Sequence, residues 1–276
     1  MEQTVNFTKM HGLGNDYIYI ETIKDNYQID KEKNIQEVVR YLSDRHFGIG
    51  GDGVIFIEKS KNADFKMRMF NSDGSEAEMC GNGIRCFAKY VYDEGFTQKE
   101  IIKIETLAGI KEVTFIKDKQ NRIEKVKVNM GIPKIEEKKQ IFLFDEKMEI
   151  NVISMGNPHA IIFVDNVEHI DIEKYGAFIE NHEIFPQKTN VEFVQILDKN
   201  LIKMRVWERG AGETLACGTG ACASVVAGVI NNLTRRKVKT LLTGGELEIE
   251  WEKETNEIYM TGIATKVFEG KIKLDI

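Results

Sequence analysis

One segment occurs twice in this chain, and the two copies constrain the fold more than any other feature. Cys80 and Cys217 each stand before a Gly-x-Gly triplet, and an arginine lies twelve residues before each cysteine. An aromatic residue precedes each cysteine by ten positions, and a threonine follows each by twenty-six. Because the repeat is about half the chain, it predicts two related lobes rather than a solenoid of many short units.

Each cysteine precedes an apolar run that predicts a helix, so each thiol is expected at a helix N-terminus. The first N–H groups of a helix have no partner inside the helix and can face a ligand. The positive end of the helix dipole also favours a thiolate over a thiol. The repeat therefore predicts two reactive cysteines beside two anion-binding turns, with Cys86 and Cys222 packed in the core behind them.

The hydrophobic periodicity predicts a strand-rich chain with one long helix per lobe, which is typical of an α+β fold. The first lobe is expected at residues 1–130 with Cys80, and the second at 131–276 with Cys217. Whether the final strand (266–276) returns to the first lobe stays open. The expected helices are 35–45, 83–92, 172–181 and 220–231, and the expected strands are 6–10, 17–21, 54–58, 65–70, 101–106, 110–116, 125–129, 147–154, 160–164, 190–196, 202–207, 246–251, 257–265 and 271–276.

Composition excludes several classes of partner. A net charge of −6 argues against nucleic acid, because a phosphate-binding surface requires excess Lys and Arg. No apolar run approaches the ~18 residues that span a bilayer, and the first residues do not resemble a signal peptide. We therefore expect a cytoplasmic protein with reduced cysteines and no membrane partner, while its oligomeric state stays open, a homodimer included.

Two thiols that face each other across a cleft between the lobes could act on one carbon atom. A substrate carboxylate held by both glycine turns would place its α-carbon between the sulfur atoms. One thiolate would remove the α-proton, and the other thiol would deliver a proton to the opposite face, which inverts the centre. The expected activity is therefore a cofactor-free epimerisation in a cleft that closes on its substrate.

The motifs of this chain resemble those of the diaminopimelate epimerases, in the same order and over nearly the whole length. They are HGLGND at 11–16, NSDGS at 71–75, CGNGIRC at 80–86, GNPH at 156–159, ERGAGET at 208–214 and ACGTG at 216–220. The resemblance implies two pseudo-symmetric lobes, each a mostly antiparallel sheet wrapped around a central helix, with the active-site cleft between them. It also implies interconversion of LL- and meso-diaminopimelate for lysine and cell-wall synthesis, with no cofactor and no metal.

The same resemblance assigns roles to individual residues. The acid–base pair would be Cys80 and Cys217, with Glu208 and His159 tuning the thiols or holding the substrate amine. The backbone amides on the reacting carboxylate would belong to Gly81, Asn82, Gly218 and Thr219. The remaining contacts to the diacid would come from Asn15, Asn71, Asn157, Asn190, Glu208 and Arg209, with Arg209 on the distant carboxylate. Many relatives carry glutamine where Gly53 stands, which leaves one substrate contact open.

Three other functions stay open from the sequence. A related two-cysteine racemase could act on another amino acid, such as histidine, and a non-catalytic protein could keep a two-lobe cleft that binds amino acids. A thiol redox or metal-binding protein would also use cysteines, although the spacing from Cys80 to Cys86 exceeds that of common zinc motifs. The glycine run at 48–53 lacks the lysine of a phosphate-binding loop, which disfavours nucleotide binding.

Overall fold

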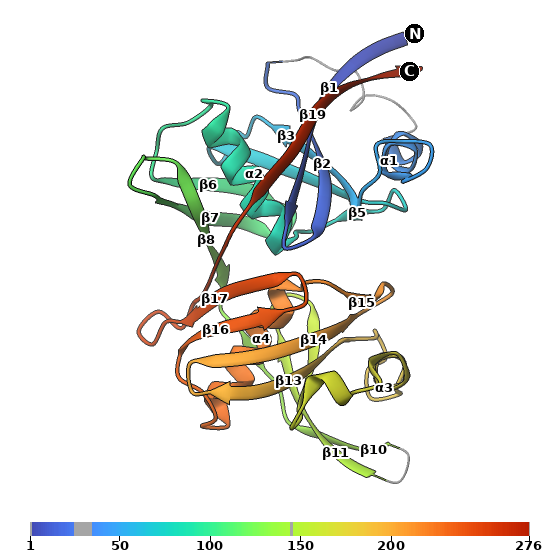
Figure 1. The fold of residues 1–276 in the computed structure, drawn as a ribbon, viewed down its shortest axis with the longest axis vertical. Coiled ribbons are helices and arrows are strands. Elements are labelled where there is room, and N and C mark those ends of the chain that lie inside the picture. The colour runs from blue at the N-terminus through green and yellow to red at the C-terminus, as the bar shows by residue number, and fades with distance from the viewer. Residues whose placement is uncertain (1, 25–34, 144–145, 276) are drawn as a thin grey trace. The chain divides into compact units, whose positions relative to one another are not determined.

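Tertiary contacts divide the chain into two compact units. The computed structural model describes residues 2–24, 35–143 and 146–275. One unit comprises Met1–Val128 with Ile263–Ile276, and the other comprises Asn129–Gly262. Figure 1 shows both units as sheets with few helices, which confirms the predicted mixed, sheet-dominated α+β class.

The first unit is a mixed sheet with two helices. Parallel pairing joins β2 to β3, with Tyr17 opposite Gly53, and also joins β4 to β6. The C-terminal strand β19 pairs antiparallel with β1, from Glu2 opposite Asp275 to His11 opposite Thr265, and the two ribbons lie side by side in Figure 1. The elements are β1 (Glu2–Gly12), β2 (Asn15–Glu21), α1 (Ile35–Ser43), β3 (Gly53–Glu58), β4 (Phe65–Asn71), β5 (Glu76–Ala77), α2 (Gly81–Asp93), β6 (Ile101–Thr106), β7 (Gly109–Lys117), β8 (Ile123–Gly131) and β19 (Thr265–Asp275).

The second unit repeats this plan. Parallel pairing joins β12 to β13, with His159 opposite Asn190, and also joins β14 to β16. The elements are β9 (Lys134–Ile135), β10 (Lys139–Leu143), β11 (Glu146–Ser154), β12 (Pro158–Phe163), the 3₁₀ turn η2 (Val167–His169), α3 (Ile172–Glu180), β13 (Asn190–Asp198), β14 (Leu201–Glu208), β15 (Gly212–Thr214), α4 (Gly218–Ile230), β16 (Lys237–Leu242), β17 (Gly245–Trp251) and β18 (Ile258–Gly262).

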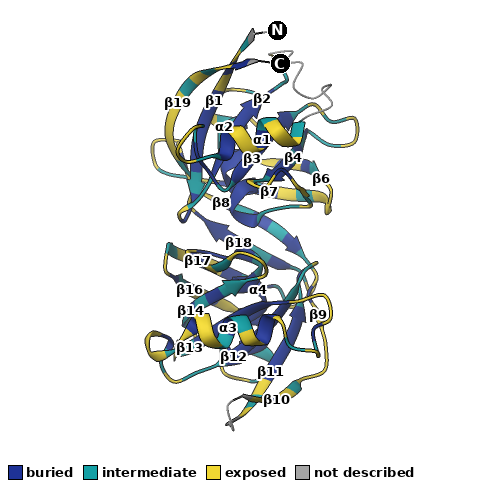
Figure 2. Ribbon diagram, turned by 90° about the vertical axis from the view of Figure 1, so that its right-hand side faces the viewer, coloured by how far each residue is buried: buried dark blue, intermediate teal, exposed yellow. Residues whose placement is uncertain are grey.

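A buried helix forms the centre of each unit. Helix α2 contacts β1, β2, β3 and β7, while α4 contacts β11, β12, β13, β17 and β18. Most residues of α4 are small, so the strands approach it closely, and Figure 2 colours much of it as buried. Cys86 and Cys222 are fully buried in these helices, which confirms their predicted place in the core.

Several predictions of element bounds were wrong, and some strands were not predicted. Both central helices begin two residues earlier than predicted, at Gly81 and Gly218, because glycine is compatible with the first helical turn that follows each cysteine. No strand was predicted at Lys237–Leu242, where exposed lysines and a buried Thr240 weaken the apolar alternation of β16. The strand predicted at 257–265 ends at Gly262, and Thr265 begins β19, whose predicted end, Ile276, lies outside the described residues.

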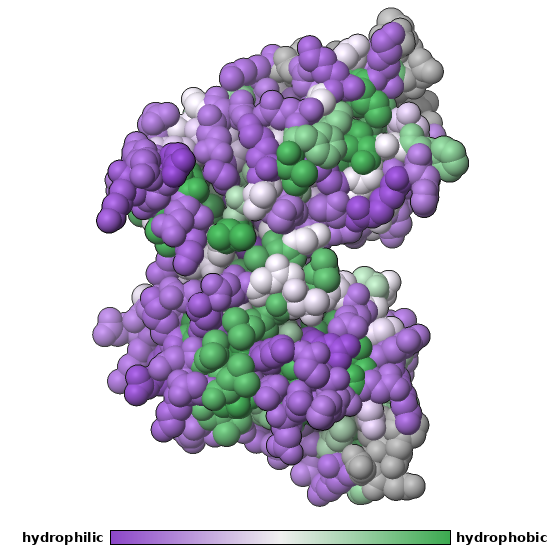
Figure 3. All heavy atoms as spheres, in the orientation of Figure 1, coloured by the Kyte–Doolittle hydropathy of each residue, from purple (hydrophilic) through white to green (hydrophobic). Residues whose placement is uncertain are grey.

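The visible face of both units is mostly hydrophilic, as Figure 3 shows. Among residues 2–24, 35–143 and 146–275, every helix is too short or too polar to cross a bilayer.

Candidate active site

Both repeated cysteines are the N-cap residues of the central helices. Cys80 precedes α2 with extended backbone angles (φ −126°, ψ 123°), and Cys217 precedes α4 with nearly the same angles (φ −117°, ψ 111°). Each sulfur accepts a hydrogen bond from a backbone N–H of the first turn, from Gly83 in α2 and from Gly220 in α4, both at 3.4 Å. The repeat therefore places two thiols in equivalent positions where helix N–H groups can stabilise negative charge.

An asparagine amide holds the Cys80 thiol. The Cys80 Sγ donates to Asn15 Oδ1 at 3.2 Å, and Asn82 Nδ2 donates to the same oxygen at 3.3 Å. The Asn15 Nδ2 donates to Asp52 Oδ2 at 2.7 Å, which fixes the direction of the amide. Asp52 was not among the predicted site residues, and its place in the glycine loop at 48–53 was the only sequence signal for it.

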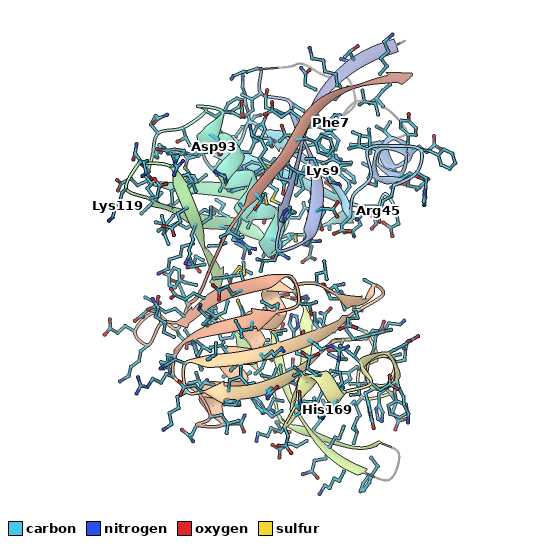
Figure 4. All side chains as sticks on the ribbon, viewed as in Figure 1. Phe7, Lys9, Arg45, Asp93, Lys119 and His169 are labelled. Carbon is cyan, nitrogen blue, oxygen red and sulfur yellow. The ribbon has the colours of Figure 1, made fainter. Side chains whose placement is uncertain are left out.

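Two cations anchor the loop that carries Asn15. The Lys9 ammonium and the Arg45 guanidinium contact the Asp16 carboxylate at 2.6 and 2.7 Å, and Arg45 also reaches Asp52 at 2.9 Å. Burial raises the pKa of Asp16, but hydrogen bonds from Arg45 and Lys9 outweigh burial and lower it below its usual value. Figure 4 shows Lys9 on the strands and Arg45 beside α1, so the loop is held from two sides.

A buried arginine fixes the first turn of α2. The Arg85 side chain is fully buried and donates to Gly81 O at 3.1 Å and to Asn82 Oδ1 at 2.9 Å. Its Nε donates to Ile263 O at 3.3 Å, which ties the first turn of α2 to the segment before β19. Arg85 belongs to the CGNGIRC motif, but its sequence position gave no indication that it would be buried.

The second thiol lies in a different environment. Cys217 is 5% exposed, and its sulfur is 3.5 Å from Thr219 Oγ1, which accepts from Asn157 Nδ2 at 3.4 Å. Burial raises the pKa of Cys217 well above its usual value, and the carboxyl groups of Glu208 and Glu192 raise it further. Hydrogen bonds from Thr219 and Gly220 lower it less than burial raises it. In this conformation Cys217 is therefore a thiol, although the helix N-terminus by itself favours a thiolate.

Glu208 lies close to the same thiol. Burial raises the pKa of Glu208 first, and the neighbouring Glu192 raises it further, while a hydrogen bond from the Thr214 hydroxyl lowers it. His159 is fully buried, and its Nδ1 is 2.7 Å from Glu192 Oε1. The predicted residues Cys217, Glu208 and His159 are thus brought together around Glu192, which the sequence analysis missed because a glutamate inside an apolar strand gives no distinct signal.

Among the described residues, one group of possible metal ligands comprises His159, Glu192 and Cys217. Their ligand atoms lie within 4.8 Å of one another, which is close enough to hold a metal ion. Two ligands of a tetrahedral zinc ion, with bonds of ~2.1 Å, lie ~3.4 Å apart. The 2.7 Å between His159 Nδ1 and Glu192 Oε1 is instead the length of a hydrogen bond. His159 and Glu192 are therefore joined by a hydrogen bond in this conformation, and these two atoms would have to move apart for both to bind one metal ion.

The other predicted binding residues lie at or directly after the ends of strands β4, β13 and β14. Asn71 Nδ2 donates to Ser75 Oγ at 3.0 Å in the turn after β4. Asn190 donates to Pro158 O at 2.9 Å and accepts from the Arg209 backbone at 3.0 Å. The Arg209 side chain is exposed and donates to Gln187 O at 3.1 Å, so it is accessible to an anionic ligand.

Gly53 leaves no room for a side chain. A Cβ at this position would lie 2.0 Å from Phe70 O, a backbone atom that cannot move aside. Any larger residue here, glutamine included, would therefore need a different path of β3 and β4.

Strand register defines which residues of the two units are equivalent. Tyr17 opposite Gly53 in the first unit corresponds to His159 opposite Asn190 in the second. Two residues further along, Ile55 lies opposite Tyr19 in the first unit, and Glu192 lies opposite Ile161 in the second. Ile55 and Glu192 are 137 positions apart in the sequence, as are the two cysteines. The same offset relates Asn71 to Glu208. The Cys80 thiol contacts the amide of Asn15 and lies near Tyr17, whose pKa burial raises well above its usual value, whereas the carboxyl groups of Glu208 and Glu192 raise the pKa of Cys217.

Comparison with known sequences identifies the family. The sequence model of the diaminopimelate epimerase family matches residues 7–136 and 151–267. The chain belongs to the diaminopimelate epimerase family. A diaminopimelate epimerase of Methanococcus maripaludis is 54% identical over 98% of this chain and all of its own length. One of Acetivibrio thermocellus is 51% identical over 98% of this chain and 99% of its own.

Solved structures share the fold at low sequence identity. A hydroxyproline epimerase from Agrobacterium vitis superposes with a TM-score of 0.77 at 13% identity, covering 99% of this chain and 93% of its own. A PhzF-family phenazine biosynthesis protein of Bacillus anthracis gives 0.75 at 16% identity, covering 98% and 99%. These likenesses place the diaminopimelate epimerase family chain in a fold that epimerases of other substrates also adopt.

Proposed function

We propose that this chain interconverts LL- and meso-diaminopimelate without a cofactor, as a cytoplasmic step towards lysine and cell-wall precursors. The observation that supports this most is the pair of equivalent N-cap thiols in a chain of this family. Two relatives that are 51% and 54% identical over at least 99% of their own length are named diaminopimelate epimerase.

In the proposed mechanism, Cys80 and Cys217 act on opposite faces of one α-carbon. The thiolate of one cysteine takes the α-proton, the electron pair moves towards the substrate carboxylate, and the thiol of the other cysteine protonates the opposite face. The first-turn N–H groups at Gly81, Asn82, Gly218 and Thr219 would hold that carboxylate, where charge develops. After each turnover the two cysteines have exchanged roles, which suits a reversible reaction.

Solvent exchange of the α-proton tests the activity. Incubation with diaminopimelate in deuterated water should place deuterium at the α-carbon with no added cofactor. Exchange into histidine but not into diaminopimelate would move the assignment to a related racemase, and exchange into neither would leave a binding protein. Cys80→Ser and Cys217→Ser should each abolish epimerisation in a folded protein, and normal turnover in either variant contradicts the two-thiol mechanism.

A second test addresses the distant carboxylate. Arg209→Ala should weaken binding of the diacid far more than binding of an amino acid with a neutral tail, because the exposed guanidinium would pair with the second carboxylate. Lys188→Ala removes another exposed cation of this unit and serves as the matched control. Equal losses for both ligands would remove the role assigned to Arg209.

A further inference from the structure

Glu192 lies beneath the first turn of α4 without a packing reason for a carboxyl group. Its side chain is fully buried, and a Cβ on Gly220 would lie 2.5 Å from its Oε1. In the first unit the same place under Gly83 holds an Ile55 methyl group, 2.8 Å from the corresponding Cβ position. The fold therefore accepts an apolar residue here. Because burying an ionised carboxylate costs several kcal/mol, Glu192 requires another explanation.

The contacts of His159 supply that explanation. Its Nδ1 is 2.7 Å from Glu192 Oε1, and its Nε2 is 3.1 Å from Asn157 Oδ1. The Asn157 Nδ2 donates to Thr219 Oγ1, so the oxygen of the amide is the atom turned towards His159. Both ring nitrogens thus face oxygen atoms, whereas a neutral imidazole carries only one N–H. A second proton is needed to join all of these groups by hydrogen bonds.

We infer that His159 and Glu192 hold one shared proton in the resting protein, which neutralises the carboxyl group beneath Cys217. The proton lies between Nδ1 and Oε1, and the pair has no net charge whichever atom carries it. The other Glu192 oxygen is buried and has no hydrogen-bond partner among the described residues, as a neutral carboxyl group tolerates better than an anion. Glu192 is thereby a positioning residue, which acts through His159 on Asn157.

The catalytic role of this shared proton rests on the proposed function. In one direction of the reaction Cys217 must give up its proton, although burial and the carboxyl groups of Glu208 and Glu192 oppose this. The titratable groups that face Glu192 are His159 on β12, Glu208 at the end of β14 and Cys217 before α4. With the shared proton in place, Glu208 is the remaining carboxylate against the Cys217 thiolate. Ionisation of Cys217 then becomes accessible when substrate binds.

Nitrogen NMR of the wild-type protein tests the proton count without any variant. In protein labelled with ¹⁵N-histidine, His159→Gln assigns the signals of one ring among the five histidines. At neutral pH we expect Nε2 to carry a proton. A second proton should give a separate downfield signal, and it should either couple to Nδ1 or lie beside it. An unprotonated Nε2, with an ordinary N–H at Nδ1, would mean neutral His159 beside ionised Glu192 and would overturn the inference.

The reactivity of Cys217 gives a second test that needs no turnover. In a Cys80→Ser background, iodoacetamide labelling of Cys217 is followed against pH by peptide mass spectrometry. Glu192→Gln keeps the pair neutral, so the labelling midpoint should stay where it is. Glu208→Gln removes a carboxyl group that raises the pKa of Cys217 in either case, and it should lower the midpoint by about one pH unit or more. A similar fall in Glu192→Gln would show an ionised Glu192 and overturn the inference.

Two variants separate positioning from packing. Glu192→Ile copies the residue of the first unit and should fold, yet it leaves Nδ1 without its partner and should remove the downfield proton. Glu248→Gln removes an exposed carboxylate paired with Lys237 and should change neither the histidine signals nor the labelling midpoint. Because neither readout uses epimerisation, failure of this inference and failure of the proposed function give different results. A downfield proton that persists in Glu192→Ile would assign it elsewhere and contradict the pairing.

Discussion

The two glycines at the third helical position offer a matched pair of substitutions. Gly83→Ala and Gly220→Ala add the same methyl group at equivalent points of α2 and α4. The gain in helix propensity, up to about 1 kcal/mol, is common to both variants and cancels in their comparison. What differs is the neighbour, which is Ile55 Cδ1 at 2.8 Å from the Gly83 methyl and Glu192 Oε1 at 2.5 Å from the Gly220 methyl.

The structure sets the size of the difference. Ile55 can turn its terminal methyl group aside at a cost of about 0.5–1.5 kcal/mol. The Glu192 carboxyl is held 2.7 Å from His159, and displacing it leaves buried polar atoms without their hydrogen bond at a cost of about 1–3 kcal/mol. We therefore expect Gly220→Ala to be less stable than Gly83→Ala by about 1 kcal/mol. For a chain of this size that is a difference of about 2–4 °C in melting temperature.

Thermal unfolding of both variants in one buffer, followed by urea unfolding, measures this difference. Wild-type protein is the reference for the shared helix gain, and far-ultraviolet circular dichroism checks that both variants fold. Equal melting temperatures, or a lower one for Gly83→Ala, would refute the argument that Glu192 is fixed by His159 and cannot move aside.

Three further predictions concern buried groups. Arg85→Met should lower the free energy of unfolding by about 3 kcal/mol or more in urea titrations, because several buried acceptors each lose a donor at about 1–3 kcal/mol; a loss below 1 kcal/mol would contradict its anchoring role. Burial raises the pKa of Cys86 to about 11, so Cys86 should resist iodoacetamide at pH 8 while Cys80, which is partly exposed, reacts, as peptide mapping would show. The pKa of Glu208 is raised above 4.5 in the folded protein, so the folded state keeps this proton to higher pH than the unfolded chain. The stabilisation from this group is therefore fully present below pH 4.5 and is lost as the pH rises through the raised pKa of Glu208. Over that pH range, Glu208→Gln should lose less free energy of unfolding than the wild-type protein.

The local patterns of the sequence were sufficient for much of this protein. The repeated cysteine segments predicted two equivalent helix N-termini, and apolar alternation predicted most strands, because both features depend on residues close together in the chain. The motifs from His11 to Gly220 also indicated the family, which the sequence comparisons confirmed.

Other features were decided only by tertiary structure. Pairing of β19 with β1 joins the two ends of the chain, and no local pattern specifies a partner so distant in sequence. Asp52 holds the asparagine that contacts Cys80, while Tyr17 lies near Cys80 and Glu192 near Cys217. Sheet register and packing place all three, and each looks ordinary in its own segment. The electrostatic difference between Cys80 and Cys217 has the same origin. The repeat makes the two backbones alike, but the pKa of Cys217 depends on burial and on carboxyl groups brought from other strands, which exist only once the chain has folded.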